Sequence, residues 1–191
     1  MRTALQFGVV PARITASLYG LTSLPAAGLT LLTAVFLHGG WTHLLGNMLY
    51  LWIFGDNVED RLGSLTYLIF YLGAGIIASI AQITIDPTST TPVIGASGAI
   101  AGVLGAYVIT FPRAKVQTLL ILIVYITIIQ VPASVFIVLW FVLQVLSGFV
   151  SLSSGVVAVA WWAHIGGFLA GMVLMTLLPK RKISQPEPDI Y

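Results

Sequence analysis

The sequence predicts an all-α polytopic membrane protein, a helical bundle of about five to six transmembrane helices. Three observations predict this class. The 191 residues are 58% hydrophobic and only 7% charged, whereas soluble domains carry about 25% charged residues. The apolar residues gather in long uncharged stretches, and most basic residues lie in the short polar segments between or after them. A chain of this kind belongs in a lipid bilayer, which is its first expected partner.

Composition also excludes several classes of function. The chain has no cysteine, so it has no disulfide framework, no thiolate nucleophile and no zinc site built on sulfur. The net charge of +2 is too small to indicate a nucleic-acid partner. No metal or organic cofactor is implied, and nothing in the sequence indicates an oligomeric state. Residues 1–20 lack the continuous apolar core of a signal peptide, so we expect insertion to rely on the later spans.

Six apolar stretches are the candidate spans, because a spanning helix needs about 20 mainly apolar residues. They cover residues 41–55, 64–85, 94–111, 116–131, 133–150 and 156–178. Short breaks separate them, among them GDNVEDRLG, DPTSTTP, FPRAK and SLSSG. Before the first stretch, LPAAGLTLLTAVFLHGG is apolar but short and ends in two glycines. We therefore expect it to form a loop or hairpin that lies in the membrane interface.

The basic residues predict the orientation of these spans. The cytoplasmic side is marked by Arg61, Arg113, Lys115 and the KRK segment at 180–182. The breaks at 86–92 and 151–155 carry no Lys or Arg and are therefore external. Only one of the two stretches between Lys115 and the second external break can then cross. The β-branched run at 116–131 favours a re-entrant or interfacial element, which leaves 133–150 as the span and predicts five crossings.

The acidic residues of the first break have a simpler interpretation. They are Asp56, Glu59 and Asp60. Because they follow a span on its cytoplasmic side, we expect them to form a solvated loop that turns the chain into the next span.

Polar side chains inside the apolar stretches are the candidate functional residues, because ionisable groups in lipid are costly and usually mark function. All three histidines, His38, His43 and His164, lie in or beside such stretches. His43 and Asn47 are four positions apart, so they share one helix face near the external end of the first span. Ser97 and His164 lie toward the external ends of their own spans. The charge topology therefore allows these groups to meet at one depth.

Glycines indicate how two of these spans could meet. They follow Ser97 and His164 at matching four-residue spacings, as Gly98 with Gly102 and Gly167 with Gly171. Small residues at this spacing let two helices approach closely in lipid. Ser97 would then lie near His164, and a serine that passes its proton to an imidazole is the minimum requirement for nucleophilic acyl transfer.

The oxyanion formed in such a reaction needs hydrogen-bond donors, and the same region offers them. The Ser97 amide near a helix N-terminus is unpaired, and Asn47 and His43 carry side-chain donors. Each residue also has a structural interpretation. A serine among glycines in a membrane helix is most often a packing residue, and His43 with Asn47 could instead be interhelical hydrogen-bond partners, each worth about 0.6 kcal/mol. For His38 we expect a structural role.

Three ordered motifs favour the chemical interpretation: HGGWTHLLGN, GASGAIAG and AHIGGFLAG. They resemble the histidine–asparagine, G-x-S-G and H-x-x-G-x-x-x-G motifs in the second, fourth and sixth helices of the rhomboid intramembrane serine proteases. The segment VEDRLG at 58–63 also resembles the loop after the second family helix, and the resemblance extends from about residue 29 to 178.

The resemblance implies a compact helical bundle around a water-filled cavity that opens to the external side. It implies that Ser97 is the nucleophile and His164 the general base of a Ser-His dyad. His43 and Asn47 resemble the side-chain oxyanion donors. The implied activity is endopeptidase cleavage in or beside transmembrane segments of membrane-protein substrates, which are the second expected partner. The expected location is the plasma membrane of a prokaryote.

The chain departs from the family pattern at three places. No counterpart of the family's first helix, which precedes the long external loop, is seen in the sequence. Leu29 and Thr30 stand where many members have a Trp-Arg pair. Ala101 stands where some members have an aromatic ring that stacks on the base, so we expect Trp161 or Trp162 to help orient the imidazole.

We expect three segments: an N-terminal segment with the external interfacial loop at 1–40, the membrane domain at 41–178 and a cytoplasmic tail at 179–191. Two other functions stay open. A non-proteolytic member that binds or escorts other membrane proteins would keep the same bundle, although this chain retains both the serine and the base. A small transporter or channel would explain the intramembrane histidines but not the G-x-S-G motif, and the sequence has no internal repeat of the transporter kind.

Overall fold

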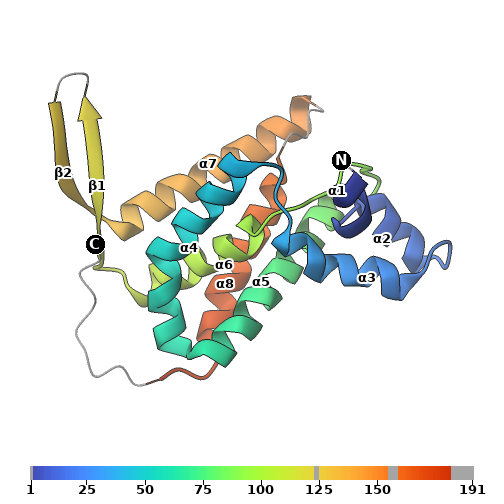
Figure 1. Cartoon of the computed structure of the whole chain (residues 1–191), viewed down its shortest axis with the longest axis horizontal. Coiled ribbons are helices and arrows are strands. Elements are labelled where there is room, and N and C mark those ends of the chain that lie inside the picture. Colours follow the sequence, from blue (N-terminus) through green and yellow to red (C-terminus); the bar gives the residue numbers. More distant parts are fainter. Residues whose placement is uncertain (1, 123–124, 155–158, 182–191) are drawn as a thin grey trace.

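Eight α-helices, one short 3-10 helix and one β-hairpin make up the part of the chain that the computed structural model describes, residues 2–122, 125–154 and 159–181 (Figure 1). In chain order they are α1 (Arg2–Phe7), α2 (Pro11–Leu18), α3 (Leu24–Thr33), η1 (Ala34–Phe36), α4 (Trp41–Leu62), α5 (Ser64–Ile85), α6 (Ser97–Thr110), β1 (Lys115–Leu122), β2 (Tyr125–Pro132), α7 (Ala133–Ser154) and α8 (Trp161–Leu177). The predicted all-α membrane bundle is confirmed, with the hairpin as an addition to it.

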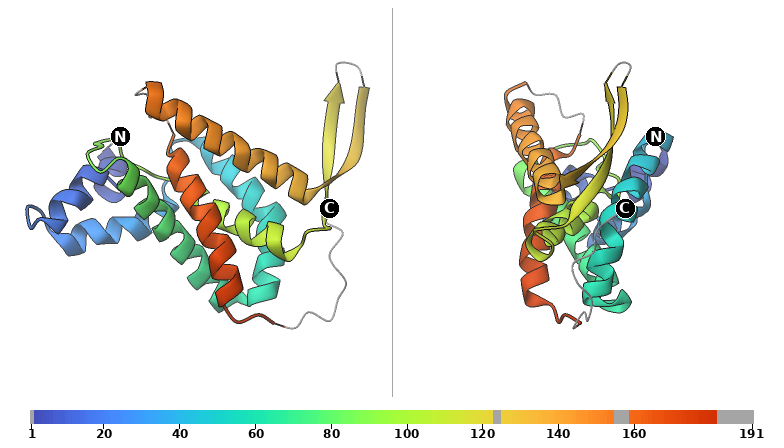
Figure 2. Two further views of the ribbon diagram at one scale, coloured as in Figure 1. Left: turned by 180° about the vertical axis from the view of Figure 1, so that it is seen from behind. Right: turned by 90° about the vertical axis from the view of Figure 1, so that its left-hand side faces the viewer.

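Helix α6 is the centre of the bundle. Every residue from Gly98 to Tyr107 is buried, and a helix that is apolar all round suits such a position. Helices α4, α5, α7 and α8 surround it, as the two further views show (Figure 2). Below the level of Ser97 the core is filled mainly by large side chains, including Phe54, Tyr107 and Leu104.

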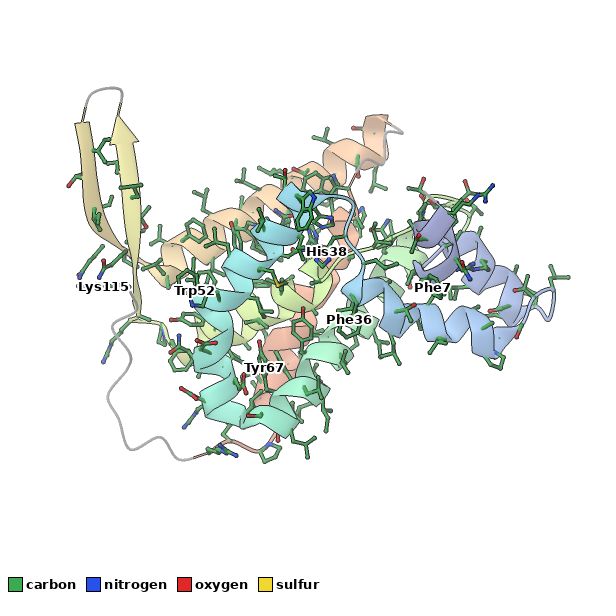
Figure 3. All side chains as sticks on the ribbon, in the orientation of Figure 1. Phe7, Phe36, His38, Trp52, Tyr67 and Lys115 are labelled. Atoms are coloured by element: carbon green, nitrogen blue, oxygen red, sulfur yellow. The ribbon has the colours of Figure 1, made fainter. Side chains whose placement is uncertain are left out.

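The outer faces of the bundle are apolar. Leu45 and Trp52 of α4 are 63% and 70% exposed, and Leu139 of α7 is 58% exposed; Trp52 points away from the bundle (Figure 3). An exposed apolar surface of this extent is unusual for a soluble protein and ordinary for one surrounded by lipid. These side chains therefore face the hydrocarbon of the bilayer.

The five helices predicted as spans are all present. By length and composition α5 and α7 can each cross a membrane, and α4 passes the same test together with the α3–η1 segment, from which it is bent by 79°. Helices α6 and α8 are apolar but shorter, with 14 and 17 residues. The C-terminal ends of α4 and α8 lie together, since Arg61 Nη1 donates to the Arg181 carbonyl at 2.7 Å. The two basic ends thus share one side of the bundle, as the charge pattern predicts.

Several predicted boundaries are wrong. The predicted acidic loop is helical: Asp56, Glu59 and Asp60 lie on the last turns of α4, which ends only at Gly63. Charged residues do not end a helix, whereas a glycine with φ of 81° does so readily. In the same way α7 continues through most of the predicted break at 151–155, to Ser154. Residue 155 itself, and the tail beyond Arg181, fall outside the described residues.

The N-terminal segment is mainly helical rather than a loop. Helices α1, α2 and α3 pack beside the end of α5 and are tied to the loop before α6 by a short bridge, in which Val9 and Val93 exchange backbone hydrogen bonds of 3.0 and 2.7 Å. At the turn between α2 and α3, Leu18, Tyr19 and Leu21 are 68%, 78% and 77% exposed. Apolar and aromatic side chains at such a turn suit the interfacial position expected for this segment.

The β-branched run at 116–131 folds as a β-hairpin. Strands β1 and β2 are antiparallel, in a register that pairs Lys115 with Pro132 and Leu122 with Tyr125. A hydrogen bond of 2.8 Å from the Ala133 N–H to the Ala114 carbonyl closes its base. In Figure 3 and in the left view of Figure 2 the hairpin extends away from the bundle, with Lys115 at its base. The structure therefore gives this stretch no spanning helix, in keeping with the parity argument.

Candidate active site

A cavity of about 580 Å³ lies at the end of the bundle where α4, α6 and α8 begin. The four predicted site residues, Ser97, His164, His43 and Asn47, all line it. The chain enters α6 through Gly95, whose φ of 123° is open to glycine but strained for other residues. The Gly95 N–H donates to the Ala34 carbonyl at 2.9 Å, which holds this loop against η1. Ser97 is therefore placed at the first turn of a buried helix, facing the cavity.

The Ser97 hydroxyl and the His164 imidazole are in direct contact. Ser97 Oγ lies 2.8 Å from His164 Nε2, across 67 residues of sequence. Both side chains are half-buried, so the hydroxyl can be reached from the cavity. At this distance the imidazole can accept the hydroxyl proton, as a nucleophile and its base require.

Glycine residues along α6 and α8 permit this contact, because they have no side chain to hold the two helices apart. A Cβ atom at Gly167 would collide with the Gly98 carbonyl, and one at Gly171 would collide with the Gly102 carbonyl. The two collisions are four residues apart on both helices, so α6 and α8 run parallel and in register. The predicted glycine faces do meet. Ser97 directly precedes Gly98 and His164 precedes Gly167 by three residues, so the same approach brings the serine to the histidine.

His43 lies on α4 facing Ser97, and a hydrogen bond determines which of its ring nitrogens carries the proton. The Gly39 N–H donates to His43 Nδ1 at 3.2 Å, so a neutral His43 carries its own proton on Nε2. A Cβ built on Gly95 would lie 2.8 Å from His43 Nε2 and 3.6 Å from Ser97 Oγ. The Nε2–H donor and the hydroxyl are therefore close neighbours on the cavity wall.

Asn47 adds a second donor one helical turn further along α4. Its side chain is only 7% exposed, and its Nδ2 has no hydrogen-bond partner among the described residues. A buried polar group without a partner costs about 1–3 kcal/mol and calls for an explanation. An amide on the wall of a cavity has one, since it can bind a group that enters the cavity.

Similarity to known proteins identifies the family of the chain. A family model described as a rhomboid domain matches residues 26–181. The chain belongs to the rhomboid family. Like other integral membrane proteins, this rhomboid buries its polar site among apolar helices.

Relatives of this rhomboid carry related names. Rhomboid protease GluP of Bacillus subtilis is 50% identical over 76 residues, 40% of this chain and 14% of the relative. Rhomboid-like protein 11, chloroplastic, of Arabidopsis thaliana is 30% identical over 161 residues, 83% of this chain and 55% of the relative. Rhomboid protein 1, mitochondrial, of Saccharomyces cerevisiae is 33% identical over 92 residues, 46% of this chain and 27% of the relative. The rhomboid chain thus spans little more than half, or less, of each of these relatives.

His38 stands behind the site of this rhomboid rather than in it. It lies between η1 and α4 (Figure 3) and is absent from the cavity wall among the described residues. Its ring meets the His43 ring edge to face, with centroids 5.2 Å apart. Desolvation lowers the pKa of His38, and the nearby His43 lowers it further. A neutral ring packed against His43 fits the structural role expected for it.

The surroundings of the rhomboid imidazole were only partly foreseen. The Trp161 ring does meet the His164 ring edge to face at 6.2 Å, whereas Trp162 packs against Phe149 instead. Trp140 of α7 lies 5.9 Å from the imidazole, and Gln144 Oε1 lies 2.7 Å from His164 Nδ1. Sequence reasoning missed both residues of α7. A signal existed, because Gln144 is the single amide in an otherwise apolar span.

Gln82 of α5 is a second buried amide that sequence reasoning missed. It is 3% exposed, and its Oε1 has no partner within the part of the chain that the structure describes. It lines both the main cavity and a smaller one of about 280 Å³ beside Asp86 and Trp162. The polar lining of this rhomboid cavity therefore extends beyond the motif residues toward the end of α5.

Proposed function

We propose that this rhomboid is an intramembrane serine endopeptidase that cleaves transmembrane segments of membrane-protein substrates. We further propose that it works in the plasma membrane of a prokaryote, with its cavity open to the external side. The observation that carries the proposal is the 2.8 Å contact between Ser97 Oγ and His164 Nε2 on the wall of a cavity that also holds unpaired donors.

The residues support a two-step acyl transfer. His164 Nε2 accepts the Ser97 proton while Oγ bonds to the carbonyl carbon of the scissile peptide. When the tetrahedral intermediate collapses, the C–N bond breaks and His164 returns the proton to the leaving amine, which leaves an acyl ester on Ser97. In the second step His164 removes a proton from water, the resulting hydroxide attacks the ester, and the Ser97 hydroxyl is released with its proton restored.

Three donors are suited to the oxyanion of each step. The Ser97 N–H lies in the first turn of α6, where backbone amides have no partner within the helix. The His43 Nε2–H and the Asn47 Nδ2–H face the same cavity from α4. A donor aimed at developing charge in a site that excludes bulk water contributes most to the transition state.

The substrate must reach this site as extended chain. A helical backbone buries its carbonyl carbons within its own hydrogen-bonded turns, so the segment to be cleaved has to unwind first. The cavity wall is rich in glycine, with Gly39, Gly46 and Gly75 among its lining residues. We therefore propose that residues with small side chains next to helix-breaking ones are preferred at the cleavage site.

The proposal is tested with the purified protein in liposomes and a labelled transmembrane substrate. We expect the parent to cleave it and to react with a serine-directed fluorophosphonate, and we expect the Ser97→Ala and His164→Ala variants to do neither. A Ser153→Ala variant, altered at an exposed serine of α7, serves as the matched control and should behave as the parent. Equal cleavage by the parent and both site variants would refute the dyad.

A second function has one observation in its favour. Among the relatives of this chain is one named rhomboid-like rather than rhomboid protease, so a binding or escorting role for the same bundle deserves a test. In that case the parent would bind a transmembrane segment without cleaving it, and Ser97→Ala would leave that binding unchanged. The retained serine and imidazole, in contact, favour the peptidase.

A further inference from the structure

Gln144 reaches the catalytic imidazole from a helix that carries none of the recognised motifs. It lies near the middle of α7, its side chain is 7% exposed, and its Oε1 lies 2.7 Å from His164 Nδ1. The opposite ring nitrogen, Nε2, lies 2.8 Å from Ser97 Oγ. One imidazole therefore connects a hydroxyl of α6 to an amide of α7.

This contact decides where the proton of His164 resides. An amide oxygen only accepts hydrogen bonds, so the 2.7 Å contact requires a proton on Nδ1. In a neutral ring Nε2 then keeps its lone pair, which points at the Ser97 hydroxyl. The other tautomer would put an N–H opposite the hydroxyl and leave no base. We propose that Gln144 is a positioning residue that holds His164 in the one tautomer able to accept the Ser97 proton, a role that rests on the proposed peptidase function.

The group that accepts a hydrogen bond from His164 Nδ1 is neutral. Helices α5, α6, α7 and α8 pack around His164, and within their bounds they contain no Asp, Glu, Lys or Arg. On the facing α4, His43 and Tyr50 line the same cavity, whereas Asp56, Glu59, Asp60 and Arg61 lie on its last turns. The tyrosines Tyr67 and Tyr71 of α5 and Tyr107 of α6 lie in or against the core, and Asp86 caps the end of α5 beside the smaller cavity. The Nδ1 side of the imidazole thus faces an amide where hydrolases with a triad have a carboxylate.

Trp140 completes the same face of α7. It lies one helical turn before Gln144, and its ring is 5.9 Å from the imidazole at an interplanar angle of 38°. Residues four apart share a helix face, so α7 presents a ring and an amide together to His164. Packing alone would be served by any side chain of similar size at position 144, whereas the tautomer needs an acceptor there. This difference makes the proposal testable.

The test compares Gln144→Met, which keeps the length of the side chain but removes the acceptor, with Gln144→Glu, which keeps an acceptor and adds charge. The rate of fluorophosphonate labelling of Ser97 is measured against pH for each, and thermal unfolding is followed in parallel. We expect Gln144→Met to label more slowly by about 10- to 100-fold, the range seen for partners that orient functional histidines at metal sites. Gln130→Met, the same change at an exposed position of β2, is the matched control.

The Gln144→Glu variant tests the direction in which the pH profile of labelling moves. A carboxylate beside Nδ1 favours the protonated imidazole, so the acid side of the labelling profile moves to higher pH. At alkaline pH labelling should recover to the parent rate or above. A purely structural role for Gln144 would let Gln144→Met, which keeps the size of the side chain, label as fast as the parent as long as it stays folded. A profile of Gln144→Glu that coincides with that of the parent would overturn the proposal.

Nuclear magnetic resonance of ¹⁵N-labelled histidine separates this inference from the proposed function. The chain has only three histidines, so the His164 signals can be assigned by comparison with His164→Ala. We expect the Nδ1–H tautomer in the parent and a mixture of tautomers in Gln144→Met. If the parent has this tautomer but neither labels nor cleaves, the peptidase is wrong and the positioning stands. If Gln144→Met keeps the parent tautomer, the positioning is wrong whatever the activity.

Discussion

At the scale of single residues, the unpaired amide of Asn47 is the clearest evidence of built-in function. Proteins rarely bury a donor without a partner, because such a group loses its hydrogen bonds to water on folding. Asn47 is nearly fully buried, and its Nδ2 has no partner in residues 2–122, 125–154 and 159–181. The same group, aimed at an oxyanion, stabilises the transition state without any rearrangement at the moment of reaction.

Replacing this amide should separate activity from stability. We expect Asn47→Ala to lower kcat by about 10²–10³-fold, or about 3–4 kcal/mol, as for other single oxyanion donors. The unfolding temperature should not fall, since the variant removes an unsatisfied buried group. The measurements are steady-state cleavage and thermal unfolding, with Asn57→Ala on the same helix as control. Unchanged kcat in Asn47→Ala would exclude it from the oxyanion site.

The candidate site residues were predictable from sequence because their neighbours in the chain mark them. His43 with Asn47, and Ser97 or His164 with their following glycines, form local patterns whose meaning does not depend on the rest of the fold. Gln144 has no such pattern. Its role depends on how α7 lies against α8, and that packing follows from side-chain shapes along the whole helix.

At the scale of elements, the glycine faces of α6 and α8 determine the site. Gly98 and Gly102 meet Gly167 and Gly171 backbone to backbone, where a larger side chain would hold the helices apart. In lipid this close packing is itself a main source of helix association. The sequence predicts it because four-residue spacing of glycine has few other uses in an apolar helix.

A single methyl group in this contact should inactivate the enzyme. A Cβ at Gly171 would collide with the Gly102 carbonyl, whereas a Cβ at Gly73 of α5 has only Leu174 Cδ1 near it, at 3.9 Å. We therefore expect Gly171→Ala to abolish fluorophosphonate labelling and Gly73→Ala to leave it intact. Gly102→Leu, a larger change at the same contact, should also be inactive. Full labelling of Gly171→Ala would remove the argument that close approach of these helices positions the dyad.

Two elements were predicted only coarsely, for different physical reasons. The run at 116–131 and a buried helix are both continuous apolar stretches, which periodicity cannot tell apart. Only its β-branched residues indicated that it differs from the spans, and the structure makes it a hairpin. The acidic end of α4 is helical although its charges predict the end of the span, because a helix can extend beyond the hydrocarbon into water.

At the scale of the whole molecule, the basic residues and the cavity lie at opposite ends of the bundle. The cavity lies where α4, α6 and α8 begin, and Arg61 and Arg181 lie together where α4 and α8 end. Basic residues favour the cytoplasmic side, so we expect the cavity to face outward. This orientation follows from a few charges at the ends of helices and not from the chemistry of the site.

The absence of native cysteine makes the orientation directly testable. Thr90 in the loop before α6 and Asp60 near the end of α4 are both exposed. We expect a membrane-impermeant maleimide to label Thr90→Cys in intact cells, and to label Asp60→Cys only after the membrane is permeabilised. Each variant is first checked for fluorophosphonate labelling, which confirms the fold. The reverse labelling pattern would place the cavity on the cytoplasmic side.

The backbone contact between α6 and α8 also limits how surrounding lipids can act on the proposed peptidase. Carbonyl oxygens already touching glycine Cα atoms cannot be pressed closer, and each helix is stiff along its axis. A thicker or thinner bilayer would tilt α6 and α8 together, without changing the distance between the Ser97 hydroxyl and the His164 imidazole. Lipid composition should therefore affect the entry and unwinding of a substrate, while attack on a small soluble acylating agent proceeds at the same rate in every membrane.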